Sequence, residues 1–160
     1  GYVAAVGWYL SVADVCFLLL DIFLLSLFGT ALSSIINYFL STQGQISAVG
    51  TVISAGYGFI CGAYMPISSF GEGLQKVISF LPGTYATSLI RNHSMRGVLE
   101  ALEAEGVPDA AMKGLCDALD CNLYFFDHAV TQPMMFLILV ASIVILVGLY
   151  VLLNCRRAKR

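Results

Sequence analysis

The stretch at residues 56–66, GYGFICGAYMP, decides how the chain is arranged, because it places helix-weakening residues inside a membrane-length apolar segment. The segment runs from about residue 46 to residue 65, which is long enough to cross a bilayer. The quoted stretch carries three glycines and stops at a proline. Proline cannot continue the hydrogen-bond ladder of a helix, so we expect the span to end at Pro66.

Small residues recur at every fourth position of this span and would form a nearly straight stripe on one helix face: Gly50, Ser54, Gly58 and Gly62. Lipid gives helices no hydrophobic reason to associate, so close backbone approach across small residues supplies the attraction. An upstream segment has a matching set at Ser26, Thr30 and Ser34. We expect these two faces to pack together. The alternative is that the glycines are merely tolerated in a membrane helix.

The composition of the whole chain indicates an all-α, polytopic membrane protein. Of the 160 residues 59% are apolar and only 11% are charged, and the mean hydropathy is +0.86. Residues 15–40 and 134–154 also suffice to span the bilayer, which gives three predicted transmembrane helices with residues 46–65. Residues 1–10 are apolar but too short to cross, and we expect them to be the end of an earlier span.

Basic residues at the end of the chain set the predicted orientation. The tail at residues 155–160 directly follows the last span and carries Arg156, Arg157, Lys159 and Arg160. The positive-inside rule therefore places this tail in the cytoplasm. The turn at residues 41–45, STQGQ, then lies inside, and residues 66–133, which we name the cap, lie outside.

The cap is predicted to contain several short helices. Apolar residues at helical spacing precede Pro82, and the pattern resumes after it until Gly106. A third helix is expected to begin at Pro108, because proline is favoured at the first helical position. The pieces around Pro82 are apolar enough to dip into the outer leaflet if protein covers them.

Two polar residues of the first span are candidates for a translocation path, namely Asp21 and Asn37. A carboxylate within the membrane is a functional-site hypothesis by default. The alternative for Asp21 is a structural hydrogen bond or salt bridge to a helix of the missing half, which we expect to precede residue 1.

The cysteines of the cap, Cys116 and Cys121, could form a disulfide in an oxidising compartment, whereas a continuous helix would hold them apart. The spacing of the potential ligands matches no closed zinc pattern, so we expect no metal site.

Sequence signatures of enzymes are absent from the 160 residues: there is no common hydrolase motif and no nucleotide-phosphate loop. We therefore expect no catalytic residues and no cofactor in this chain. No basic patch is interleaved with aromatic residues, so nucleic acid is not an expected partner. The expected partner is the lipid bilayer.

The order of these features resembles the C-terminal half of the membrane subunit, or permease, of type-2 ABC exporters. In that family the fifth span ends in Gly-x-x-x-Pro, a Leu-Gln pair opens a short outer helix, and a proline is followed by an arginine. The matching residues here are Gly62, Pro66, Leu74, Gln75, Pro82 and Arg91. The chain departs from the pattern at residues 71–73, where many relatives have a proline, and residues 100–132 are not a shared motif.

The resemblance implies a permease that moves drugs, antibiotics, lipids or polysaccharides outward across a bacterial plasma membrane. It also implies a separate ATPase subunit or domain that binds ATP and Mg, and a second permease half with which this one forms a dimer. A different class remains open from the residues alone: a non-transporting membrane anchor whose cap binds an extracellular partner.

Overall fold

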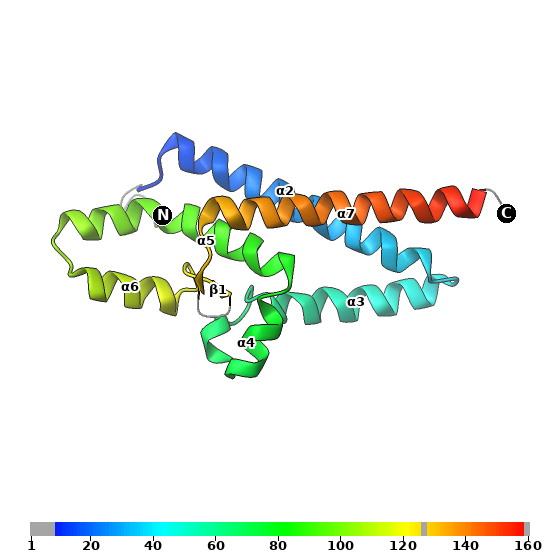
Figure 1. Cartoon of the computed structure of the whole chain (residues 1–160), viewed down its shortest axis with the longest axis horizontal. Coiled ribbons are helices and arrows are strands. Elements are labelled where there is room, and N and C mark those ends of the chain that lie inside the picture. The colour runs from blue at the N-terminus through cyan, green and yellow to red at the C-terminus, as the bar shows by residue number, and fades with distance from the viewer. Residues whose placement is uncertain (1–8, 126–127, 159–160) are drawn as a thin grey trace.

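A computed structural model describes residues 9–125 and 128–158, and it is almost entirely helical (Figure 1). The helices are α2 (Val12–Tyr38), α3 (Gln43–Ile60), the 3₁₀ helix η1 (Ile67–Ser69), α4 (Glu72–Ile78), α5 (Pro82–Ala104), α6 (Asp109–Ala118) and α7 (Gln132–Ala158). Two short strands, β1 (Tyr124–Phe125) and β2 (His128–Ala129), pair antiparallel. Most of the predicted end of an earlier span, residues 1–10, lies outside the described residues, as do Lys159 and Arg160.

Two of the described helices, α2 and α7, are long and apolar enough to cross a bilayer. The start of α2 is set by a capping box: the Ser11 side chain accepts from the backbone of Ala13, and the Asp14 carboxylate accepts from the Ser11 N–H at 3.0 Å. With 27 residues, α2 is about 40 Å long. The all-α class is thus confirmed, whereas the count of three spans stays a prediction.

The second predicted span, residues 46–65, corresponds to α3, which is shorter than expected. It has 18 residues, about 27 Å, and ends at Ile60 rather than near residue 65. The cause is Gly62, whose φ of +79° is a left-handed conformation that favours glycine and turns the chain out of the helix. Pro66 then caps the start of η1. The predicted stripe therefore loses its fourth member, because Gly62 lies beyond the helix.

The main packing unit consists of α2, α5 and α7, which contact one another, while α3 lies to one side (Figure 1). A buried cluster joins these three helices: Leu24 and Phe28 of α2, Ala86 of α5 and Leu139 of α7. A second cluster fills the cap with Ile67, Ile78, Tyr85, Leu89, Leu123 and Met135. The first half of α5, after Pro82, is therefore enclosed by protein.

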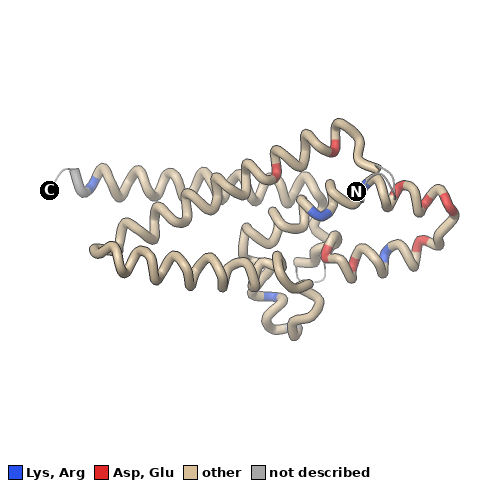
Figure 2. Tube along the Cα trace, turned by 180° about the vertical axis from the view of Figure 1, so that it is seen from behind, with Lys and Arg blue, Asp and Glu red and all other residues tan. Residues whose placement is uncertain are grey.

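The molecule has two different ends (Figure 1). The turn between α2 and α3 lies at the same end as the C-terminus, and the cap lies at the other end. Figure 2 shows that the described acidic residues gather on the cap and on the part of α2 near it, while α3 and α7 carry almost no charged residues along their length. This arrangement positions a long apolar region between a charged cap and a basic tail.

Candidate functional site

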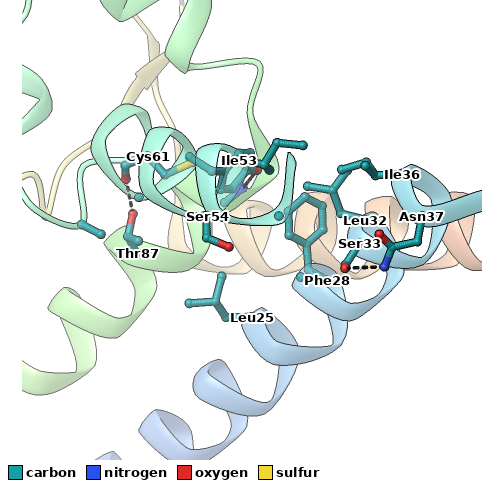
Figure 3. Close-up of a pocket in the computed structure, with 16 residues that line it drawn as sticks. Leu25, Phe28, Leu32, Ser33, Ile36, Asn37, Ile53, Ser54, Cys61 and Thr87 are labelled. Carbon is teal, nitrogen blue, oxygen red and sulfur yellow. Dashed lines mark hydrogen bonds between the residues drawn. The ribbon is translucent and has the colours of Figure 1, made fainter. Parts of the chain in front are cut away.

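A cavity of about 350 Å³ lies between α2 and α3 and is bounded by the beginning of α5 (Figure 3). The α2 side is formed by residues at helical spacing, among them Leu25, Phe28 and Leu32. The α3 side includes Ile53 and Tyr57. This is the size and lining of a small-molecule site, which is mostly apolar and has a few placed polar groups.

The described residues that line the cavity contribute hydroxyls, one amide and the Cys61 thiol as polar side-chain groups, and none of these residues is charged. Ser33 and Asn37 line it from α2, and the Asn37 amide donates to the Ser33 hydroxyl at 3.4 Å. Ser54 contributes a hydroxyl from α3, and Thr87 contributes one from α5 (Figure 3). Such a surface suits a neutral or amphiphilic molecule better than an ion. Asn37 thus lines the cavity, and its role in a translocation path stays a prediction.

The small-residue stripe borders this cavity instead of packing against α2. Gly50, Ser54 and Gly58 line the open space. The expected partner face does not meet α3: Ser26 and Thr30 are exposed, and the hydroxyls of Thr30 and Ser34 donate to backbone carbonyls one turn earlier in α2 itself, at 2.8 and 2.7 Å. The prediction that the two faces pack together is therefore corrected.

Two aromatic rings explain why α2 and α3 do not approach closely. The ring centroids of Phe28 and Tyr57 lie 6.1 Å apart across the gap between the helices. Rings of this size prevent the backbone contact that small residues alone would allow. The space beside them forms the cavity.

The cap end of the cavity is closed by contacts between α5 and the end of α3. The backbone N–H of Gly83 donates to the Tyr57 hydroxyl at 3.2 Å, and the Thr87 hydroxyl donates to the Cys61 carbonyl at 2.7 Å (Figure 3). One helical turn further along α5, Arg91 donates to the Gly62 carbonyl. The bonds from Thr87 and Arg91 satisfy carbonyls that the end of a helix leaves without an intrahelical partner.

Arg91 also forms an ion pair within the cap. Its guanidinium lies 2.8 Å from a carboxylate oxygen of Asp120, whose side chain is only 4% exposed. The same carboxylate accepts from the backbone N–H groups of Ile67, at 2.5 Å, and Ser68, at 3.3 Å. Asp120 lies between α6 and β1, in the region to which the sequence assigned no function.

Asp21 does not line the cavity. It is 1% exposed and its carboxylate lies 2.5 Å from Nδ1 of His93 on α5. The ring of Phe17 stacks on this histidine with centroids 5.1 Å apart. One face of α2 thus pairs with α5. Asp21 makes a structural bond, but its partner lies on a helix of this chain and not in the missing half.

A second ion pair extends this contact between α2 and α5: Asp14 lies 3.6 Å from Arg96. The sequence did not identify His93 or Arg96 as partners. A usable signal existed, because two carboxylates seven residues apart on one helix face require polar partners on the helix that covers them.

The two cysteines of the cap are free thiols. Cys116 lies within α6 and Cys121 just beyond it, and the Cys121 N–H donates to the Cys116 carbonyl at 2.8 Å. Burial raises the pKa of both thiols, that of Cys121 to about 11. The disulfide stays a prediction. Among the described residues no group of three or more His, Cys, Asp or Glu is placed to hold a metal ion.

The remaining residues of the family pattern shape the cap. Pro82 is the first residue of α5, where its missing N–H has no cost. The Gln75 side chain donates to the Phe70 carbonyl at 2.6 Å and so holds α4 against the segment before it. Leu74 is exposed, and α4 begins after Gly71 although the proline of many relatives is missing.

An apolar helical body with two membrane-length helices, a cavity lined mainly by apolar side chains and a charged cap (Figure 2) suits a membrane component. Comparison with protein families agrees: the ABC-2 type transporter model matches residues 2–93, more than half of the chain. The chain belongs to the ABC-2 type transporter family, whose domain is the membrane component of an ABC transporter and is not itself catalytic. No curated protein and no solved structure matches the chain.

Proposed function

We propose that the chain is the permease component of an ATP-driven exporter of hydrophobic or amphiphilic molecules, such as drugs, antibiotics or lipids. The observation that supports this proposal is the cavity between α2 and α3, which offers apolar walls with hydroxyl and amide groups and, among the described residues, has no charged residue in its lining. An ion would lack counter-charges there, and a hydrophobic molecule would find most of its surface covered.

The orientation that we propose has the tail in the cytoplasm and the cap outside, in the plasma membrane of a bacterium. Two features support it: the tail is basic, and the α2–α3 turn shares its end of the molecule with the C-terminus (Figure 1). ATP and Mg would bind a partner ATPase subunit or domain on the cytoplasmic side. A second permease half would complete the path across the membrane.

Filling the cavity tests the proposal. Gly50 lines it, and a side chain there would meet no atom within 4 Å of its Cβ, so Gly50→Leu adds bulk to the cavity without a clash at the backbone. Gly44→Leu is the matched control, because Gly44 lies on the same helix in equally open space but does not line the cavity.

The assay is ATP-dependent transport of fluorescent amphiphiles by the full-length protein with its ATPase, reconstituted in lipid vesicles. We expect Gly50→Leu to reduce transport by about tenfold, the size of effect that one displaced apolar contact region can have, and Gly44→Leu to transport normally. Equal transport by both variants would exclude the cavity from the path. Absence of transport by the unmodified protein for every amphiphile would refute the proposed substrate class.

A further inference from the structure

Two oppositely charged residues meet where the cap touches the end of α3. Arg91 lies on α5, and Asp120 lies in the segment between α6 and β1, 29 positions later in the sequence. Their charged groups are 2.8 Å apart. Neither group is satisfied by the other alone. Arg91 also binds the carbonyls of Gly62 and Leu119, and Asp120 also accepts from two backbone N–H groups of η1.

The backbone that carries Asp120 is fixed to α5. The Ser88 hydroxyl donates to the Asp120 carbonyl at 2.9 Å, and the Asn92 amide donates to the Cys121 carbonyl at 2.7 Å. Ser88, Arg91 and Asn92 lie on one face of α5, because they are three and four positions apart. Together, α5 and the segment around Asp120 therefore form one platform.

The positive guanidinium and the negative carboxylate of this platform both contact a single turn of the chain. The turn runs from Gly62, at the end of α3, to Ser68, in η1. Arg91 binds the carbonyl at the beginning of the turn, and Asp120 binds the amides near its end. A carbonyl at a helix end attracts a cation, and free amides at a helix start attract an anion, so the pair matches the polarity of the turn.

The same turn forms the cap end of the cavity. Cys61 and Ala63 line the cavity next to Gly62, and Thr87, one helical turn before Arg91 on α5, binds the Cys61 carbonyl. A separation of the platform from the turn would open the cavity at this end. The Arg91 side chain is 26% exposed, so water can reach the pair and replace its bonds when the parts separate.

We propose that Arg91 and Asp120 form a latch that closes the cap end of the cavity, and that Asp120 is the positioning residue that keeps Arg91 on the Gly62 carbonyl. Release of the latch frees the end of α3 from α5. If the proposed export function holds, this release is the step that lets the transported molecule leave toward the cap side. The closure itself depends only on contacts within this chain.

Cys61 is a built-in reporter of the latch, because it is 2% exposed and lies directly beside the turn. The experiment uses the full-length protein in membranes, with the other four cysteines of residues 1–160 and any elsewhere in the protein replaced by serine or alanine. A membrane-impermeant maleimide is added from the cap side, and the labelling rate of Cys61 is measured without ATP. A closed latch protects the thiol.

Asp120→Asn removes the charge that positions Arg91. We expect it to raise the labelling rate about tenfold or more, since an arginine that loses its buried partner no longer has a fixed position. Asp120→Glu, which keeps the charge, should return the rate toward that of the parent. Asp117→Asn is the matched control: this carboxylate also lies in the cap but binds Asn122 and Tyr124, so the rate should stay within about twofold.

A folded Asp120→Asn protein that labels at the parent rate would overturn the latch, and so would an equal increase in Asp117→Asn. If Asp120→Asn does not fold, Arg91→Lys serves instead, because an ammonium group lacks the fork that holds several partners at once. An unchanged rate in that variant would overturn the proposal in the same way. Labelling that responds to the latch in a protein that transports nothing would refute the export function and leave the latch standing.

Discussion

The buried pair between Asp21 and His93 provides the sharpest test of how α2 is held. The two atoms are 2.5 Å apart, the aspartate is 1% exposed, and Phe17 covers the histidine ring. A hydrogen bond to a charged group contributes about 1.5–3 kcal/mol to stability, and more is lost if a partner is left buried and unpaired. Asp21→Asn retains an acceptor oxygen, so we expect a loss of about 1.5–3 kcal/mol.

Asp14→Asn is the natural comparison, because it removes the same charge from the same face of α2. Its partner Arg96 is 53% exposed and the ion pair is 3.6 Å long, and an asparagine oxygen can still accept from the Ser11 N–H of the capping box, so the loss should be about 1 kcal/mol or less. Thermal unfolding of the full-length protein in detergent, followed by circular dichroism, measures both variants. A double-mutant cycle with His93→Gln should give a coupling energy of about 1 kcal/mol or more for Asp21. Equal losses for Asp21→Asn and Asp14→Asn, or no coupling to His93, would refute the reasoning.

Three further substitutions or reactions follow from the structure. Gly62→Ala should lower the midpoint of thermal unfolding while Gly50→Ala does not, because the left-handed conformation costs other residues about 1–2 kcal/mol; equal midpoints would contradict the turn described at Gly62. Burial raises the pKa of the Cys121 thiol to about 11, so this thiol should react with iodoacetamide far more slowly at pH 8 than exposed Cys155 does. Its reaction rate, measured by mass spectrometry, should rise until the pH passes that pKa. A rate that reaches a plateau near pH 9 would show that the thiol is not buried. Leu89→Ala should destabilise the protein by about 2–5 kcal/mol, since this side chain is 2% exposed in the core of the cap; an unchanged denaturation midpoint would exclude that core.

Hydropathy, together with the prolines and glycines that begin or end helices, is sufficient to predict the helical character of the chain. Long apolar runs mark α2 and α7 whatever their neighbours are, because a bilayer selects for composition as well as periodicity. Pro82 and Pro108 mark the starts of α5 and α6, since the restriction that proline imposes on the backbone is local. Such signals do not depend on tertiary contacts.

The cavity and its closure could not be predicted in the same way. The expected packing of the small residues of α3 against those of α2 takes no account of the rings of Phe28 and Tyr57. These rings hold the two helices apart, and their positions depend on how three helices meet. The partner of Arg91 is 29 positions away in a segment that the family pattern does not include. Asp21 stands out in the sequence as a carboxylate within an apolar segment, but its partner His93 lies 72 positions away on α5, so no local pattern indicates the pairing.

The central claim is that the cap and the tail lie on opposite sides of the membrane, with the tail in the cytoplasm. It is tested most directly with two single-cysteine forms of the full-length protein in intact cells: Lys113→Cys, an exposed position of the cap, and native Cys155, an exposed position before the tail. A membrane-impermeant maleimide added outside should label residue 113 at once and Cys155 only after the membrane is permeabilised. Labelling of Cys155 in intact cells, with residue 113 protected, would contradict the claim and the export direction that rests on it.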